Sequence, residues 1–371
     1  MAARPKIVLI GGDGGQSGVP RHIGHLCEVL ADTAALTVIS DRDRGGFGFA
    51  GRFDHHQVEG LATSVNPFAA GRAGRQLAEV LTQVQPDLVW AHARMALPLA
   101  RWAMRGGGLG RLMVTYHGVP FGPGHGLAKS LFSRGIEAVS LRFAPPHDMV
   151  FLTEEDRAAM PALAVGRQVH ILPNCSWLGA TPTLDRLRAG PRRLVMMTRV
   201  SAQKNLDLAA RVFAALPEDF TLDLHGMGTD APGLRARFAA VMGPEALRRV
   251  GFRGETAEVR GLLAQADGLL VTSRYEGLSI AMIEAMEAGL PVFSTAVGGT
   301  ALIRSLHPMF GAVTADLIES AATIDALTTQ YRASLAEWGG KIHAAWASHF
   351  APDIWAHQVR ALVDGVLQRR P

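Results

Sequence analysis

The chain has 371 residues, of which 48% are hydrophobic and 19% are charged, and its formal net charge is +4. This length favours two domains of ordinary size, and the composition excludes a disordered chain. No Lys/Arg block with interleaved aromatic residues occurs, so nucleic-acid binding has no support. No apolar run approaches the roughly 18 residues of a membrane-spanning helix.

The two cysteines, Cys27 and Cys175, follow no metal-binding or redox spacing, so a reducing cytoplasm is the expected location. The sequence enters a predicted strand almost at its first residue, which predicts the absence of a signal peptide. The positive net charge weakly favours an anionic membrane surface or an acidic partner. We therefore expect a cytoplasmic protein, with peripheral contact at the cytoplasmic membrane face as an open alternative.

The first half of the chain alternates apolar strand runs with helical segments. A predicted buried strand at residues 6–10 leads into a glycine-rich turn and a helix, which is a phosphate-cradling pattern. The turn lacks the G-x-G-x-x-G fingerprint and no G-x4-G-K-[ST] occurs, so a dinucleotide-dependent dehydrogenase is the least favoured function. Further strands are predicted at residues 36–40, 87–92, 111–118, 149–153 and 169–173.

Two segments of this half leave alternatives open. Asp41-Arg42-Asp43 has the D-x-D spacing of some metal–nucleotide sites, but we expect an ordinary solvated strand end. Residues 126–143 form a predicted helix, for which we expect core packing with a solvated basic edge, and peripheral membrane contact is the alternative. Its apolar and basic sides are Leu127, Leu131 and Ile136 on one and Lys129, Arg134 and Arg142 on the other.

The second half begins after residues 176–192, which carry Pro and Gly without periodicity and form a predicted linker. Strands LVMMTR, FTLDLHG, GLLVTS and PVFST then alternate with helices, which favours a second doubly wound parallel sheet. The expected domains are therefore residues 1–175 and 193–351. The segment after Pro352 forms a predicted amphipathic helix.

The stretch from Leu270 to Gly299 is the most informative part of the chain. It predicts a strand end, a polar loop, an amphipathic helix from Ser279 and a second strand from Pro291, which together form a βαβ unit. Such units bind ligands at the carboxyl ends of their strands. Here Gly277 admits close backbone approach and Ser279 is a candidate N-cap. The free N–H groups of this helix suit anionic or hydroxyl-rich ligands.

Glu276 and Glu284 flank the start of that helix. Five helical residues span at least about 7.5 Å, which is too far for a shared proton but suits two ends of one polyol ligand. The alternative is a pair of glutamates on a solvated helix face.

Arg199 and Lys204 follow the first strand of the second half. Two fixed cations at a strand end and a helix start stabilise a departing nucleotide diphosphate without a metal. The alternative is a surface-exposed Arg and Lys.

The segment SRYEGLSIAMIEAMEAGLPVFSTAVGG, with Glu276-x7-Glu284, closely resembles the E-x7-E segment of the family-4 retaining glycosyltransferases, which have the GT-B fold. Arg199 and Lys204 resemble the diphosphate clamp of that family. Thr115-Tyr116-His117-Gly118 is similar to its T-x-H-G segment.

The resemblance implies a role for each matching residue. Arg199 and Lys204 would hold the diphosphate, and Glu284 would hold the ribose. Glu276, with the backbone of Gly277, Leu278 and Ser279, would hold the sugar hydroxyls, beside His117.

The resemblance further implies that Gly18 faces the donor phosphates and that the segment with Phe252 and Arg253 meets the nucleobase through its backbone. The resemblance also implies that the last helix, about 352–371, returns to the first domain. The loop at 45–53, which is rich in Gly and Phe, is a candidate to meet the acceptor because of its position in the first domain.

The function that the resemblance implies is retaining, metal-independent glycosyl transfer in a cleft between two Rossmann-like domains. The donor would be a nucleotide-diphosphate sugar with no further cofactor. The acceptor would be a glycan, a glycolipid or a lipid-linked saccharide of envelope or exopolysaccharide synthesis. A non-hydrolysing nucleotide-sugar epimerase and a non-catalytic nucleotide-sugar-binding scaffold are the alternatives. The sequence does not choose between uracil and guanine.

Overall fold

The computed structural model describes residues 4–12, 18–41, 53–62, 66–119, 121, 124–160, 167–182 and 190–369. The chain divides into two compact units, which we call the first unit (residues 1–174 with 353–371) and the second unit (residues 175–352). Four predicted features lie wholly or mostly outside the described residues: the glycine-rich turn at 13–17, Asp43, the loop at 45–52 and residues 183–189 of the linker.

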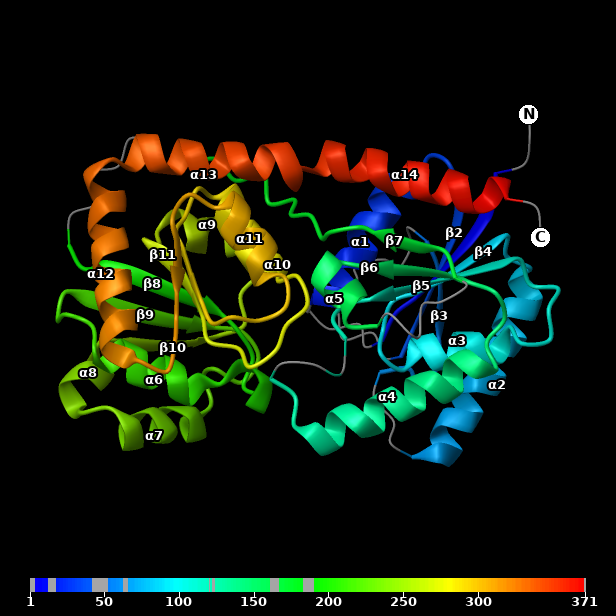
Figure 1. The fold of residues 1–371 in the computed structure, drawn as a ribbon, viewed down its shortest axis with the longest axis horizontal. Helices are drawn as coiled ribbons and strands as arrows, with labels where there is room; N and C mark the ends of the chain where they lie inside the picture. The colour runs from blue at the N-terminus through cyan, green and yellow to red at the C-terminus, as the bar shows by residue number, and fades with distance from the viewer. Residues whose placement is uncertain are drawn as a thin grey trace. The chain divides into compact units, whose positions relative to one another are not determined.

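The first unit contains a parallel sheet of seven strands in the order β3-β2-β1-β4-β5-β6-β7 (Figure 1). The strands are β1 (Lys6–Ile10), β2 (Ala35–Ser40), β3 (Asp54–Gln57), β4 (Leu88–Ala91), β5 (Arg111–Tyr116), β6 (Asp148–Phe151) and β7 (Val169–Ile171). The central strands are nearly continuous apolar runs because helices cover both faces of such a sheet. The strand order reverses between β1 and β4, the point at which doubly wound sheets bind ligands.

Six helices are described in the first unit. They are α1 (Gly18–Leu30), α2 (Pro67–Val84), α3 (Ala96–Ala103), α4 (Leu127–Arg142), α5 (Glu154–Ala158) and α14 (Pro352–Gln368). The core forms where Val8, Val89 and Val114 of neighbouring strands meet Leu77 of α2 and Leu97 of α3.

The C-terminal helix α14 packs on the first unit. The Trp355 indole N–H donates to the carbonyl of Pro173 at 2.8 Å, and the Arg360 guanidinium donates to the carbonyl of Val29 at 3.2 Å. These bonds tie the last helix to the end of α1 and to the segment after β7.

Helix α4 turns its polar side inward. Its buried residues are Ser133, Glu137 and Leu141, whereas Leu127 is 77% exposed and Leu131 is 62% exposed. The prediction that the apolar side packs into the core is therefore wrong. The physical reason is a buried polar pair contributed by α3 and β5, which only a polar helix face can satisfy.

The second unit contains a parallel sheet of six strands in the order β10-β9-β8-β11-β12-β13. The strands are β8 (Arg192–Met197), β9 (Phe220–His225), β10 (Val250–Gly254), β11 (Gly268–Val271), β12 (Val292–Ser294) and β13 (Phe310–Ala312). The core on one face joins Leu194, Leu222 and Leu270 to Phe213 and Phe238. The predicted fold class, two Rossmann-like parallel-sheet domains, is confirmed.

The helices of the second unit alternate with its strands. They are the 3-10 helix η1 (Ala202–Lys204), α6 (Leu206–Ala214), α7 (Pro232–Val241), α8 (Pro244–Arg248), α9 (Val259–Ala264), α10 (Ile280–Glu287), α11 (Thr300–Leu306), α12 (Leu317–Ala333) and α13 (Leu335–His349). Among the helices in the described ranges, none combines the length and apolar character needed to cross a bilayer.

Candidate active site

The turns after β8, β9 and β10 meet at the carboxyl edge of the second sheet. The backbone N–H of Thr198 donates to His225, and that of Gly226 donates to Gly254, each at 2.7 Å. Gly226 has a φ of +127°, and a Cβ there would lie 1.7 Å from the carbonyl oxygen of Thr198. Only glycine allows these turns to approach so closely.

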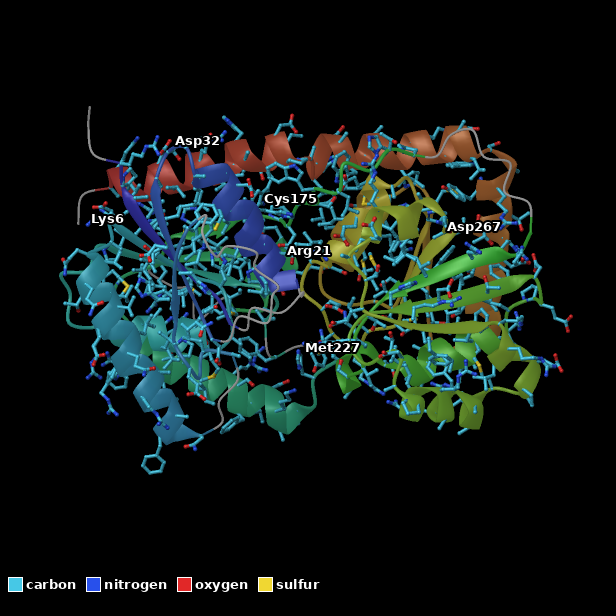
Figure 2. All side chains as sticks on the ribbon, turned by 180° about the vertical axis from the view of Figure 1, so that it is seen from behind. Lys6, Arg21, Asp32, Cys175, Met227 and Asp267 are labelled. Atoms are coloured by element: carbon cyan, nitrogen blue, oxygen red, sulfur yellow. The ribbon has the colours of Figure 1, made fainter. Side chains whose placement is uncertain are left out.

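The two edges of this sheet differ in character. Figure 2 shows Met227, in the turn after β9, at the carboxyl edge, and Asp267, just before β11, at the opposite edge. Asp267 is buried and pairs with Arg332 at 2.7 Å. Parallel α/β sheets bind ligands at their carboxyl ends, so the carboxyl edge is the candidate site.

Lys204 and Glu276 form an ion pair at the carboxyl edge. Lys204 Nζ lies 2.5 Å from Glu276 Oε1, and their side chains are only 19% and 12% exposed. Lys204 ends η1, after β8, and Glu276 lies between β11 and α10. Because β8 and β11 are neighbours in the sheet, the fold joins two predicted site residues that are 72 positions apart in sequence.

Glu276 is also held by neutral donors. The Ser273 hydroxyl donates to Oε1 at 2.7 Å, and the Gln203 amide donates to Oε2 at 3.4 Å and to the Tyr275 carbonyl at 3.0 Å. The Thr272 hydroxyl donates to the Lys204 carbonyl at 3.0 Å. The carboxylate therefore keeps hydrogen-bond donors if Lys204 turns to another anion.

Arg199 lies at the margin of this pair. Its guanidinium is exposed and donates to the Gln203 side-chain oxygen at 3.4 Å. Arg199 thus reaches Glu276 through Gln203, and it retains guanidinium N–H groups that face solvent. The structure brings Lys204 to Glu276 directly and Arg199 only through this intermediary.

Helix α10 is buried on nearly every side. The prediction of an amphipathic helix with one exposed side is therefore wrong. Glu284 is 2% exposed, which excludes the alternative of two glutamates on a solvated face. Ser279 occupies the N-cap position, but its side chain makes no capping hydrogen bond.

A glycine pair after β12 supports the loop that carries Glu276. A Cβ on Gly298 would lie 2.3 Å from the carbonyl oxygen of Glu276, and one on Gly299 would lie 2.8 Å from Leu278 Cα. The loop from Glu276 to Leu278, including Gly277, therefore packs backbone to backbone against this pair. This contact fixes where the carboxylate stands.

The first unit holds two further predicted site residues, Gly18 and His117. Gly18 is the exposed first residue of α1. His117 follows β5, and its Nε2 lies 3.4 Å from Nδ1 of His92, which follows β4. Burial lowers the pKa of His117 to about 4, so its imidazole is neutral at pH 7.

Two matches to family models cover most of the chain. The model described as Glycosyltransferase Family 4 matches residues 16–175, and the one described as Glycosyl transferases group 1 matches residues 191–330. The chain belongs to the family-4 glycosyltransferases. The predicted enzyme class is thereby confirmed.

Known proteins agree with this assignment. The glycosyltransferase is 27% identical to glycogen synthase of Mycobacterium tuberculosis (strain CDC 1551 / Oshkosh), over 76% of this chain and 75% of that protein. Its fold is similar to that of sucrose-phosphate synthase from Thermosynechococcus elongatus, with a TM-score of 0.83, 17% identity and coverage of 98% and 99% of the two chains. It is also similar to Anabaena HepE in complex with UDP-glucose, with a TM-score of 0.78, 17% identity and coverage of 98% and 100%.

The segment predicted to meet a nucleobase in this glycosyltransferase lies on β10. Phe252 packs edge-on against Phe238, with ring centres 5.3 Å apart. Arg253 pairs with Asp223 at 2.7 Å and is largely exposed. The Phe252 side chain is thus committed to the core, which leaves the strand backbone and Arg253 for any ligand contact.

Asp41 was predicted to be a solvated strand end, but its carboxylate is bound by the backbone of a turn. Its Oδ2 accepts the backbone N–H groups of Gly60 at 3.1 Å and Ala62 at 3.0 Å. The carboxylate therefore stabilises a turn in the glycosyltransferase, and the D-x-D spacing is explained at this residue without a ligand.

Sequence reasoning missed the residues that hold the site residues in place. Ser273, which binds Glu276, lies in the quoted segment that begins SRYEG, and Gln203, which also binds it, lies between Arg199 and Lys204. Gly298 and Gly299 end the longest quoted segment. Their signal was a pair of glycines shortly after the predicted strand PVFST, which is typical of a close backbone approach.

Proposed function

We propose that this glycosyltransferase is a retaining, metal-independent enzyme that moves a sugar from a nucleoside-diphosphate sugar to a glycan, glycolipid or lipid-linked acceptor. The ion pair of Lys204 and Glu276 at the carboxyl edge of the second sheet carries the proposal. A half-buried ammonium in a preorganised loop stabilises charge that develops on a departing diphosphate.

The pair explains how a cation and a carboxylate serve one ligand. A diphosphate carries more negative charge than one carboxylate, so Lys204 transfers its interaction to the phosphate when donor binds. Glu276 then remains held by Ser273 and Gln203 and accepts hydrogen bonds from sugar hydroxyls. Arg199, with guanidinium N–H groups facing solvent, supplies a second cation to the diphosphate.

The other matched residues complete the proposed donor site. Glu284 binds the ribose, and the backbone of Gly277, Leu278 and Ser279 binds the sugar. Phe252 and Arg253 lie on the strand proposed to meet the nucleobase, and Gly18 faces the phosphates. His117, a neutral imidazole, offers the sugar a hydrogen bond without a competing positive charge.

Retention follows in this proposal from attack on the face that the diphosphate leaves, with a phosphate oxygen accepting the proton of the acceptor hydroxyl. The anomeric configuration of the product, followed by NMR from the first turnover, tests this point. An epimerase would instead convert the donor sugar without any acceptor, so incubation with donor alone separates the two reactions. A non-catalytic scaffold would turn over neither.

Nucleotide binding gives the first experimental check. We expect one nucleoside diphosphate among UDP, GDP and ADP to stabilise the protein by about 2.7 kcal/mol at 100 times its Kd, because a ligand that binds only the folded state stabilises it by mass action. The solved structure of HepE with UDP-glucose leads us to expect UDP. Thermal unfolding with each nucleotide, with and without EDTA, measures the effect. The proposal is contradicted if none of the three nucleotides stabilises the protein, or if the stabilisation is lost in EDTA.

The exposed side of α4 supports a membrane-bound acceptor. We define the α4 face as Leu127, Leu131, Phe132, Ile136, Val139 and Phe143, which are between 49% and 77% exposed. The exposed basic residues Lys129, Arg134 and Arg142 lie on the same helix. An apolar face with basic flanks suits insertion among anionic lipid headgroups. We propose that α4 lies on the cytoplasmic face of the membrane, as expected of an enzyme of envelope polysaccharide synthesis.

Vesicle sedimentation tests the α4 face. We expect the wild type to sediment with phosphatidylglycerol vesicles and not with phosphatidylcholine vesicles, and Leu131→Asp with Phe132→Asp to reduce the bound fraction at least tenfold. Ile318→Asp is the matched control, because Ile318 is an 81% exposed apolar residue on α12 of the second unit. Unchanged binding by the double variant contradicts the proposal. If the wild type instead forms concentration-dependent dimers and the double variant does not, the α4 face binds a second copy of the chain.

A further inference from the structure

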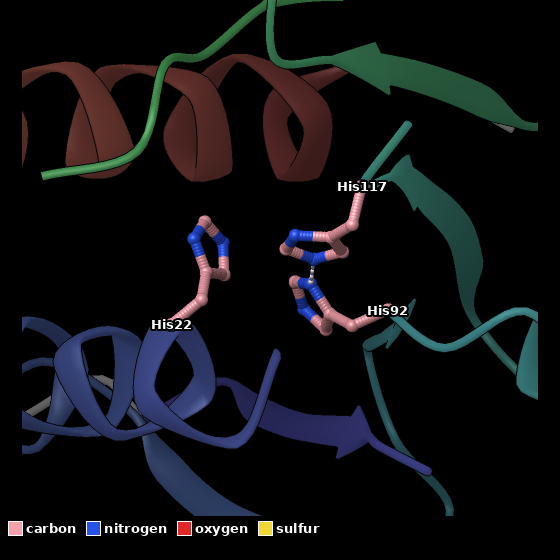
Figure 3. Close-up of side chains that lie close together, drawn as sticks. All are labelled: His22, His92 and His117. Carbon is pink, nitrogen blue, oxygen red and sulfur yellow. Dashed lines mark hydrogen bonds between the residues drawn. The ribbon is translucent and has the colours of Figure 1, made fainter. Parts of the chain in front are cut away.

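Three histidines from three neighbouring chain segments meet in the first unit. One nitrogen from each of His22, His92 and His117 lies within 4.8 Å of the other two. His22 is on α1, which follows β1, whereas His92 and His117 follow β4 and β5. Since β1, β4 and β5 are adjacent in the sheet, their carboxyl ends bring the rings together (Figure 3).

The three rings form a nearly equilateral triangle. The distances between ring centres are 4.7 Å for His22 and His117, 5.3 Å for His22 and His92, and 5.6 Å for His92 and His117. Neither of the two closest rings stacks on the other, because His22 and His117 meet edge to face at 84°. One nitrogen of each ring nevertheless lies within 4.8 Å of a nitrogen of each of the other two.

The ring of His22 is oriented by partners outside the triangle. Its Nδ1 lies 2.9 Å from Oδ1 of Asn174, so Nδ1 carries the proton and Nε2 keeps its lone pair. Trp355 of α14 packs against the ring edge to face, with centres 5.3 Å apart. In Figure 3 the ring of His22 directs a nitrogen toward His117. Such an outer hydrogen bond is the usual support of a metal-binding histidine.

Two ring nitrogens of these histidines have no hydrogen-bond partner within the described part of the chain. Nε2 of His22 and Nε2 of His92 are buried there without a hydrogen-bond partner. A buried polar atom without a partner is costly and calls for an explanation.

We propose that His22, His92 and His117 form a binding site for a divalent transition metal ion of the Zn²⁺ type, with one coordination position left open. Imidazole ligands alone favour Zn²⁺, Co²⁺, Ni²⁺ or Cu²⁺ over Mg²⁺ or Ca²⁺, which require oxygen ligands. Tetrahedral Zn²⁺ with bonds of 2.0–2.1 Å holds its nitrogen ligands about 3.4 Å apart. The three nitrogens, which lie within 4.8 Å of one another, must therefore approach by the order of 1 Å to bind the ion.

Metal binding opposes the proposed transfer reaction. His117 is the residue proposed to contact the donor sugar, and an imidazole nitrogen coordinated to metal no longer offers that hydrogen bond. The ion is thus an inhibitor rather than a cofactor, which agrees with metal-independent transfer. This consequence rests on the proposed function, whereas the binding site itself does not.

The test uses untagged full-length protein freed of metal with EDTA and then dialysed. We expect one equivalent of Co²⁺ to give the intense visible absorption of tetrahedral cobalt, and one equivalent of Zn²⁺ to displace it. His22→Ala and, separately, His117→Ala are expected to weaken Co²⁺ binding at least 100-fold. His357→Ala, at an exposed histidine on α14 of the same unit, is the matched control and leaves binding unchanged.

Thermal unfolding of the metal-free variants establishes that each is folded before it is titrated. Absence of one-equivalent Co²⁺ binding by the wild type, or equal binding by the folded variants, overturns the site. Inhibition of transfer by Zn²⁺ in the wild type but not in His22→Ala supports the link to His117. If Zn²⁺ binds at this site without slowing transfer, the site stands and the contact of His117 with the sugar is overturned.

Discussion

Lys204→Ala is expected to lower the turnover of nucleotide sugar several hundredfold. Loss of one preorganised group that stabilises transition-state charge costs roughly 10²–10³ in kcat. Lys204 is the cation in direct contact with Glu276, and Arg199 reaches that residue only through Gln203. Saturating donor is used so that the measured kcat reports the chemical step rather than donor affinity.

Misfolding does not explain such a loss, because Glu276 keeps two neutral donors when Lys204 is removed. Lys341→Ala is the matched control, since Lys341 forms an exposed i,i+4 pair with Glu337, and such pairs contribute little. Glu276→Gln provides the converse test. It frees Lys204 for the diphosphate, so UDP binding is retained or strengthened while sugar transfer falls. A change of less than threefold in Lys204→Ala would remove this residue from the mechanism.

The sequence predicted most of the strands and the positions of Lys204 and Glu276 near strand ends, because both follow from local pattern. It did not predict the ion pair between the two residues. Parallel strands covered on both faces need continuous apolar runs, such as those of β1 and β11, and these are visible without a structure. Ligand-binding residues then fall at strand ends by topology alone. The short strands β3 and β13 were missed, since DHHQ and FGA carry no apolar run, and β10, with the sequence VGFRG, was not predicted as a strand either.

The side of α4 that faces the core could not be predicted from the sequence pattern. Periodicity shows that a helix has two sides, but the side that faces inward depends on what the neighbours present. Glu137 of α4 meets the charge of Arg101 and the hydroxyl of Tyr116, which lie 36 and 21 positions away in the sequence. A local pattern contains no information on such a partner.

The cluster of three histidines was not predicted from the sequence, for a related reason. His117 was found through its motif, whereas His92 is only the last residue of the strand predicted at 87–92. His22 lies on a helix at a position that is typical of a core residue, and its partner Asn174 is 152 positions away. Only the sheet order β1-β4-β5 brings the three together.

Glu137→Ala is expected to lower the free energy of unfolding by about 3–5 kcal/mol, because it leaves a buried guanidinium without its counterion. Arg101 Nη1 donates to Glu137 at 2.7 Å, and the two side chains are 2% and 11% exposed. Tyr116 donates to the same carboxylate, and burial raises the pKa of Tyr116 well above its usual value, so the hydroxyl stays protonated. Urea unfolding measures the loss, and Glu154→Ala, which breaks an exposed pair with Arg157, is the control.

A triple variant separates the buried charge from the packing of α4. Arg101→Met with Glu137→Leu and Tyr116→Phe removes the ion pair and the tyrosine hydroxyl at once and leaves only the Ser140 hydroxyl, which accepts from Arg101 at 3.1 Å in the wild type. Apolar replacement of a buried ion pair is often neutral or stabilising. We expect this variant to recover most of the stability lost in Glu137→Ala. Recovery means that the unpaired guanidinium causes the loss and that the polar network sets which side of α4 faces inward. If the triple variant is as unstable as Glu137→Ala, the charge is not the cause, and the exposed apolar side of α4 needs another explanation.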